Sequence, residues 1–186
     1  MKKVTVLVIL LLSSLNVYSG AKEYTYIKKE LGQTTEFRTG AVGAVSIPTD
    51  MLKGARLSSF DGLVFLFKDK SNFSMEVMTD KTVGYVGVDM RSWPEYLFEL
   101  GANTGESEGF IKEAINSKIH IVDKQIAPYE IRKFSTKEGL GYWAIGKEKS
   151  LIIFTSREVS NQIVTIYTKD MKERDILKII INGVVE

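Results

Sequence analysis

The first nineteen residues restrict which part of the chain has to fold, because they have the composition of a secretory signal peptide. Lys2 and Lys3 give a positive start, residues 4–12 are almost entirely apolar, and residues 17–19 end the segment with the kind of short site that a signal peptidase cleaves. The apolar run is roughly 9 to 12 residues long, whereas a membrane-spanning helix needs about 20. We therefore expect a signal peptide over residues 1–19.

Removal of this segment fixes where the protein works. We expect cleavage between Ser19 and Gly20, with cleavage after Ala21 as the alternative, and no stable membrane anchor after processing. The protein is then periplasmic or secreted. A cysteine-free exported chain with a short lysine-containing leader is most typical of the bacterial envelope.

The chain contains no cysteine, so neither a disulfide nor a lipidated N-terminal cysteine can form. Small exported domains often rely on disulfides when their core is too small. Cleavage would leave about 165 residues, a usual size for one domain. The sequence therefore predicts a domain that folds on its hydrophobic core alone.

The charge balance of the mature chain excludes two classes of partner. The full chain has 25 Lys and Arg against 23 Asp and Glu, a formal charge of +2. Both excess positive charges are the lysines of the leader, so the mature chain is formally neutral. A neutral surface of mixed sign gives no electrostatic reason to bind nucleic acid or anionic lipid.

Apolar patterning after the leader predicts mostly strands. Residues 20–38 are the most polar stretch and form an expected entry segment with one strand, and residues 39–186 form an expected single domain. Residues 48–50 are predicted to form a turn, and residues 68–72 are predicted to join two strands as a hairpin. The predicted strands are residues 40–47, 63–67, 73–77, 83–88, 119–126, 129–134, 141–145, 151–155 and 163–168.

Three helices complete the predicted fold. Ser92 and Glu95 have the spacing of a capping box, and Trp93, Tyr96, Leu97 and Leu100 then form one apolar stripe. A second helix is expected over residues 107–116, and a third after a capping pair of Asp170 and Glu173. This order predicts an α+β fold: an antiparallel sheet covered by two central helices and a C-terminal helix, with an αβα sandwich as one arrangement of these layers.

Residues suited to catalysis are few. The single histidine, His120, lies in the predicted strand 119–126 and is interpreted as a surface or sheet-face residue. One histidine without cysteine fills neither the usual structural nor the usual catalytic zinc site, and no serine lies in a nucleophile elbow. The acidic pairs Glu106/Glu108 and Asp80/Asp89 are explained by capping and turns. We therefore predict no catalytic, cofactor-binding or metal-binding residue, and no cofactor.

Aromatic residues are the remaining candidates for a binding site. Tyr142 and Trp143 lie between Gly139, Gly141 and Gly146, and glycine beside a bulky aromatic lets another backbone approach. Tyr and Trp are common anchors in protein interfaces. We consider this pair a candidate partner contact, with a role in the core as the alternative.

Two segments resemble a known family. Val45, Ile47 and Pro48, followed by Asp50 and Met51, resemble the early strand and turn of the PsbP-like fold, which includes DcrB-like envelope proteins. Residues 163–168 and the following segment 169–185 resemble the last strand and closing helix of that fold. The resemblance implies an αβα-type sandwich that acts as an accessory or binding protein, and it carries no catalytic residue.

These features predict an exported, non-enzymatic domain that binds another protein. An immunity or inhibitor protein against an exported toxin or hydrolase is one form of this hypothesis, and an envelope accessory protein is another. A carrier of a small ligand or lipid is the alternative, since it would need only a sizeable internal cavity. A carboxylate-dependent hydrolase is third, because it requires two acidic side chains that face each other across a cleft.

Overall fold

The computed structural model of the chain describes residues 21–24, 33–38, 44–59, 62–101, 105–136 and 139–184. The predicted signal peptide and its cleavage site at Ser19 and Gly20 lie outside these residues. Within them, helices and strands are mixed as the sequence predicts, so the α+β class is confirmed. None of the helices in these ranges is both long enough and apolar enough to cross a membrane.

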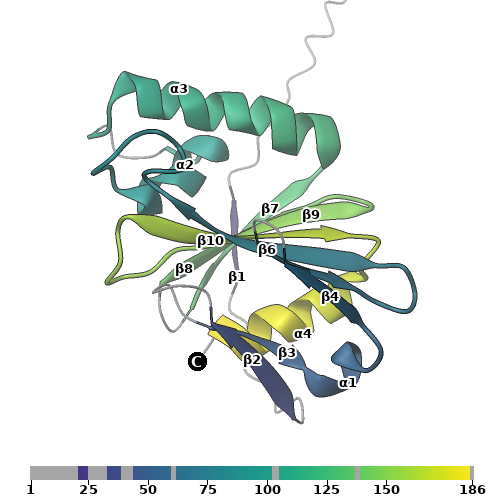
Figure 1. The fold of residues 1–186 in the computed structure, drawn as a ribbon. Helices are drawn as coiled ribbons and strands as arrows, with labels where there is room; N and C mark the ends of the chain where they lie inside the picture. The colour runs from purple at the N-terminus through teal and green to yellow at the C-terminus, as the bar shows by residue number, and fades with distance from the viewer. Residues whose placement is uncertain are drawn as a thin grey trace, which may run out of the picture.

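Eight strands form one central sheet (Figure 1). They are β1 (Lys22–Tyr24), β4 (Arg56–Ser59), β5 (Leu63–Leu66), β6 (Asn72–Thr79), β7 (Glu130–Ser135), β8 (Leu140–Ile145), β9 (Lys149–Phe154) and β10 (Gln162–Lys169). Their order across the sheet is β1-β7-β8-β9-β10-β6-β5-β4. Neighbours are antiparallel, except that β1 runs parallel to β7. The predicted strands over residues 129–134, 141–145, 151–155 and 163–168 are therefore confirmed as β7 to β10, which pair in sequence order.

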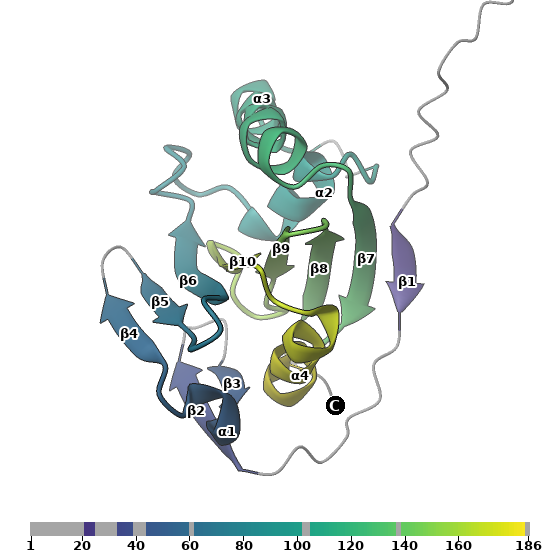
Figure 2. The ribbon, with the colours of Figure 1, turned by 90° about the vertical axis from the view of Figure 1, so that its right-hand side faces the viewer.

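Other elements cover both faces of the central sheet (Figure 2). One face, which we call the α4 face, carries α4 (Glu173–Val184), α1 (Thr49–Leu52) and a separate hairpin of β2 (Thr34–Arg38) and β3 (Ala44–Pro48). The opposite face, the α3 face, carries α2 (Trp93–Leu97), which follows a 3₁₀ turn (Met90–Ser92), and α3 (Glu108–Ser117), which continues as a π-helical stretch (Lys118–Asp123). The two predicted central helices and the C-terminal helix thus lie on opposite faces.

Alternation along the strands divides the apolar side chains between two cores. On β9, Ile152 and Phe154 belong to the core under α4, whereas Leu151 and Ile153 belong to the core under α2 and α3. All four side chains are buried. Four apolar residues in succession are typical of a central strand that is covered on both faces.

The predicted hairpin of β5 and β6 is confirmed. Leu63 lies opposite Met75, and the Phe67 backbone N–H donates to the Ser71 carbonyl at 2.9 Å to close the turn. Phe65 stacks on Phe73 with 4.4 Å between ring centroids. This hairpin extends the sheet beyond β10 and places the turn Phe67–Ser71 close to the beginning of α4.

The predicted strand over residues 119–126 is wrong, since this segment continues α3 as a helix. Val122 and Ile126 point into the core, while Ile119 and His120 are exposed. β-branched residues favour strands locally, but Val122 and Ile126 have the i, i+4 spacing that lets a helix bury both. His120 is therefore a surface residue on a helix and not on a strand.

The predicted strand over residues 83–88 is also wrong, because this segment is a series of turns. Gly84 and Gly87 have φ angles of 82° and 88°, which a strand excludes. The carboxylate of Asp80 holds the loop by accepting from the backbone N–H groups of Lys81 at 2.8 Å and Gly87 at 2.7 Å.

Neither of the two predicted helix caps forms as expected, whereas the second helix begins with a cap that was not predicted. Ser92 is itself helical and donates through its hydroxyl to the Asp89 carbonyl at 2.7 Å, so the predicted capping box does not form. Ser107 does cap α3, because it accepts from the Phe110 N–H at 3.4 Å. Asp170 lies in a turn with a φ of 57°, and α4 begins at Glu173. The apolar stripe of α2 is nevertheless buried as predicted at Trp93, Tyr96 and Leu97.

Short polar segments form structure that the sequence did not reveal. Residues 20–38 contribute two strands, β1 and β2, where one was expected, and β4 was not predicted. Thr49 and Asp50 begin α1 where a turn was expected. No side chain of β2, β4 or α1 is buried, so apolar periodicity does not mark these elements.

Candidate functional site

Tyr142 and Trp143, the candidate partner contact, are neighbours on β8 and therefore point to opposite faces of the sheet. Tyr142 belongs to the core under α2 and α3, and Trp143 belongs to the core under α4. Both side chains are buried. They do not form one joint surface, and each has to be considered separately.

Tyr142 anchors α2 to the sheet. Its hydroxyl donates to Glu95 Oε1 at 2.5 Å, and Lys133 Nζ lies 2.7 Å from the same oxygen. The Lys133 ammonium is also 5.3 Å from the centroid of the Tyr142 ring. Burial, reinforced by the bond to Glu95, raises the pKa of Tyr142. Tyr142 is thus a neutral internal donor whose hydrogen bond is already used.

The indole nitrogen of Trp143 has no acceptor in the part of the chain that the structure describes. Among the side chains that the structure describes, Trp143 Nε1 is the one buried nitrogen or oxygen that lacks a hydrogen-bond partner. The Arg132 guanidinium covers the ring, with Cζ 5.3 Å from the ring centroid. An unsatisfied buried N–H costs about 1–3 kcal/mol. An oxygen from outside these residues would recover that free energy.

Trp143 lines an open hollow that we call the Trp143 pocket. It lies on the α4 face between the β8–β9 turn and the first turn of α4, with a volume of about 460 Å³. Trp143, Ile145, Met171 and Ile176 supply its apolar lining. This volume is within the range of known ligand pockets, about 300–1,000 Å³.

The rim of the Trp143 pocket carries both signs of charge. Its charged residues are Lys147, Glu148, Asp170, Lys172 and Glu173. Glu173 is paired with Arg132, which also bonds Glu130 at 3.1 Å. The backbone N–H of Asp170 donates to the Glu148 carbonyl at 2.7 Å and joins the two turns that border the pocket. The pocket is therefore built from two loops that are distant in sequence.

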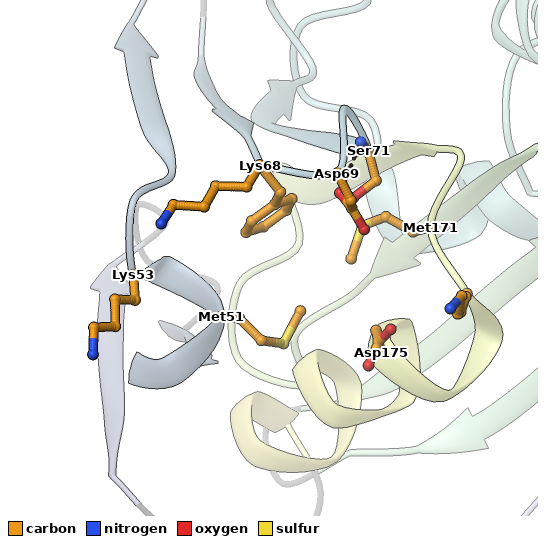
Figure 3. Close-up of a pocket in the computed structure, with 9 residues that line it drawn as sticks. Met51, Lys53, Lys68, Asp69, Ser71, Met171 and Asp175 are labelled. Atoms are coloured by element: carbon orange, nitrogen blue, oxygen red, sulfur yellow. Dashed lines mark hydrogen bonds between the residues drawn. The ribbon is translucent and has the colours of Figure 1, made fainter.

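A second hollow, the Met51 pocket, lies on the other side of the same turn (Figure 3). Met51 from α1, Met171 before α4 and Asp175 on α4 point toward its centre, whereas Lys53 and Lys68 point away from it. Its volume is about 290 Å³. Met171 and Lys172 line both the Met51 pocket and the Trp143 pocket. The two hollows thus flank one turn, residues 170–172.

Asp69, at the upper edge of the Met51 pocket, is hydrogen-bonded to a residue of its own turn. Its carboxylate accepts from the Ser71 hydroxyl at 2.6 Å and from the Ser71 backbone N–H at 3.0 Å. These bonds, first of all the one from the hydroxyl, lower the pKa of Asp69. On α4, Asp175 bonds Lys178 at 3.1 Å. Both acids therefore have intramolecular partners.

The other polar candidates lie elsewhere. His120 is exposed, with its Nδ1 3.1 Å from Lys124 Nζ. Asp80 organises its own loop, and Asp89 binds Arg91 through backbone and side chain. The bond to Arg91 is the main reason that the pKa of Asp89 is lowered. Within the described ranges, no three His, Asp or Glu side chains gather in a way that could hold a metal ion.

Sequence reasoning found Trp143 but missed the residues around it. Met51 was noted only as part of the family resemblance, and Met171 and Lys172 gave no signal, because a single methionine or lysine outside a motif does not indicate a site. One feature of the sequence could have indicated the site. Residues 169–172 are a short segment between a buried strand and an amphipathic helix, and such a segment forms a turn at the edge of a core. The pairing of this turn with the β8–β9 turn is not visible in the sequence.

Comparison with models of known protein families gives no match, and comparison with functionally curated proteins gives none either. The site must therefore be interpreted from its own geometry.

Proposed function

We propose that this protein is an exported, non-enzymatic binding protein that holds a segment of another protein in the Trp143 pocket. The indole N–H of Trp143 carries this proposal, because it is a buried donor without an acceptor among the described residues and belongs to a side chain that lines the Trp143 pocket. A carbonyl oxygen of a bound chain would satisfy it. Trp is also among the residues that contribute most to protein interfaces.

The lining of the pocket favours a peptide over a small ion. The lining combines two lysines and three acids with apolar side chains, so no single sign of charge dominates. A peptide segment presents apolar side chains, backbone carbonyls and charges of both signs, and can therefore match such a rim. Met171 suits this role because methionine adapts its shape to different partners.

The Met51 pocket would extend the contact past residues 170–172. Two flanking hollows that share Met171 and Lys172 can receive consecutive side chains of one segment. The apolar wall of the Met51 pocket includes Met51 and Phe67. A bound segment crossing both hollows would bury more surface than either hollow alone.

The expected compartment limits which proteins the partner can be. With a leader of the signal-peptide type, the partner would be met in the periplasm or outside the cell. An immunity or inhibitor protein that binds an exported toxin or hydrolase fits a mixed-charge groove of this kind, and so does an envelope accessory protein. The resemblance to PsbP-like and DcrB-like proteins is compatible with the second form.

The alternatives have less support from the geometry. A lipid carrier would need a long apolar cavity, while the hollows at α4 are open and rimmed by charge. A hydrolase would need two free carboxylates across a cleft. Asp69, Glu173 and Asp175 already bind Ser71, Arg132 and Lys178, and Glu148 and Asp170 lie on two turns that a backbone hydrogen bond joins. We therefore favour protein binding.

The test is affinity capture from the native host with three forms of the full chain: wild type, Trp143→Phe and Trp93→Phe. Trp143→Phe keeps an aromatic ring and removes the N–H. We expect a stoichiometric partner with the wild type and a yield at least about tenfold lower with Trp143→Phe, the effect of losing a central interface hydrogen bond.

Trp93→Phe is the matched control, because Trp93 is buried in the core on the opposite face. It should capture the partner as well as the wild type. In that variant Trp143 is the remaining tryptophan of two, so its fluorescence should shift when the partner is added. Equal capture by Trp143→Phe, or no stoichiometric partner under several growth conditions, would contradict the proposal.

A further inference from the structure

A third hollow lies on the α3 face, at the edge where β10 ends, and no acidic residue lines it. Its volume is about 190 Å³. The charged groups in its lining are Lys149 and Lys169, whereas the Met51 and Trp143 pockets both contain carboxylates. This hollow is therefore cationic, unlike the two hollows at α4.

The register of the sheet places the two lysines side by side on adjacent strands. Lys169 on β10 lies directly opposite Lys149 on β9. On its other side Lys169 lies opposite Asn72 on β6. Side chains in directly opposed positions have Cβ atoms about 4.5–5.5 Å apart, and like charges at this spacing destabilise a sheet.

No carboxylate of the described residues is in ion-pair contact with Lys149 or Lys169. Glu76 lies further along the same face, where it accepts from the Thr165 hydroxyl at 3.1 Å, and it does not line the hollow. The neighbouring acids Glu148 and Asp170 line the Trp143 pocket instead.

Neutral hydrogen-bonding groups complete the hollow. Asn72, Gln125 and Tyr167 contribute an amide, a second amide and a phenol to its lining. Burial, with a smaller effect of the charge of Glu76, raises the pKa of Tyr167 to about 12, so its hydroxyl keeps its proton at neutral pH. Ile121 forms part of the apolar wall that faces these groups.

We infer that this hollow, the Lys149–Lys169 site, binds a phosphate group. A phosphate monoester carries about −1.5 to −2 charges at pH 7, which matches the two positive charges of the lysines that line the hollow. A carboxylate would neutralise one of them. Lysine binds phosphate as a point charge, and Asn72 and Tyr167 can donate to the remaining oxygens. This site lies on the opposite face from the Trp143 pocket, so it does not depend on the proposed protein partner.

The phosphate can be free or carried by a small organic molecule, since both present the same dianionic head. The test is calorimetric titration and thermal unfolding of protein purified after expression of the full chain. Inorganic phosphate and glycerol phosphate are the two probes, and sodium chloride of equal ionic strength is the reference. Tighter binding of inorganic phosphate would identify the free ion, and tighter binding of glycerol phosphate would identify an organic monoester; either result supports the site.

Lys149→Gln and Lys169→Gln test the residues themselves. Each should raise the Kd for the better probe at least about tenfold, as the loss of a hydrogen bond to a charged group implies. Without phosphate, each should leave the unfolding midpoint unchanged or raise it, because it removes the repulsion between the lysines. A purely structural role for either lysine would lower the midpoint.

Lys112→Gln is the matched control, because Lys112 is exposed on α3 and lines none of the three hollows. It should bind both probes as the wild type does. The inference is overturned if neither probe stabilises the protein beyond sodium chloride, or if the Lys149→Gln and Lys169→Gln variants bind phosphate as tightly as the Lys112→Gln variant.

Discussion

The hydroxyl of Tyr142 on β8 and the carboxylate of Glu95 on α2 are joined by a hydrogen bond of 2.5 Å. Lys133 on β7 binds the same carboxylate oxygen at 2.7 Å. This oxygen thus connects two strands to the short helix that lies over them. Helix α2 has five residues, too few to be stable by itself, so its position depends on this contact and on its buried apolar stripe.

Tyr142→Phe should therefore destabilise the fold. It removes a charge-assisted hydrogen bond without opening a cavity, and we expect a loss of about 1–3 kcal/mol in the free energy of unfolding. Urea denaturation followed by circular dichroism measures this loss. Glu113→Gln, at an exposed position of α3, is the control and should change the free energy by less than about 0.5 kcal/mol. Equal effects in both variants would show that the bond does not position α2.

Local patterning explains why much of the fold could be predicted. The stripe of Trp93, Tyr96 and Leu97 and the apolar run of β9 are local patterns, because each follows from which face of one element is covered. The prediction of a strand over residues 119–126 was wrong because their β-branched side chains favour a strand, while the buried positions Val122 and Ile126 fit the helix that extends α3. Strands β1 and β4 were not predicted for a different reason. They lie at the edges of the sheet and pair through backbone groups, which leave no apolar pattern in the sequence.

Tyr167 should make stability depend on pH in the alkaline range. An unfolded tyrosine loses its proton near pH 10, whereas burial and the charge of Glu76 raise the pKa of Tyr167 to about 12. The folded state therefore holds this proton more tightly, so the contribution to stability is complete below pH 10 and is lost as the pH rises toward 12. Tyr142, with its pKa raised by burial, adds a loss of the same sign.

Urea denaturation at pH values from 8 to about 12, with tyrosinate absorbance recorded in parallel, tests this expectation. The decline should begin near pH 10, and Tyr167→Phe should make it shallower. An unchanged decline in Tyr167→Phe would assign the alkaline sensitivity to other groups.

Gly139 should tolerate no side chain. A Cβ atom at this position would lie 2.0 Å from the Thr155 carbonyl oxygen. That backbone is held in place because the Thr155 N–H donates to the Leu140 carbonyl at 2.9 Å. We expect Gly139→Ala to cost about 1–3 kcal/mol, as overpacking does. Gly105→Ala is the control, because a Cβ atom at that position would have no described atom within 4 Å, and it should be close to neutral; similar midpoints in thermal unfolding would contradict the close approach.

The candidate site was harder to predict than the fold, because its parts meet only in three dimensions. Trp143 stood out as an aromatic among glycines. Alternation along the predicted strand 141–145 already places Tyr142 on the opposite face, but the sequence could not show that the Tyr142 hydroxyl is bonded to Glu95. The opposition of Lys149 and Lys169 depends on the register between β9 and β10. A shift of one residue would place one lysine on each face.

Trp143→Phe and Trp93→Phe should differ in their cost to stability, although each removes the same atoms from a buried side chain. Both variants lose packing. Trp143→Phe also removes an N–H that has no acceptor among the described residues, and the free energy of about 1–3 kcal/mol that such a group costs is then recovered. We expect Trp143→Phe to be less destabilising than Trp93→Phe by at least about 1 kcal/mol in urea denaturation. An equal or greater cost for Trp143→Phe would mean that the indole is already satisfied within the fold, and the Trp143 pocket would lose the donor that makes it a binding site.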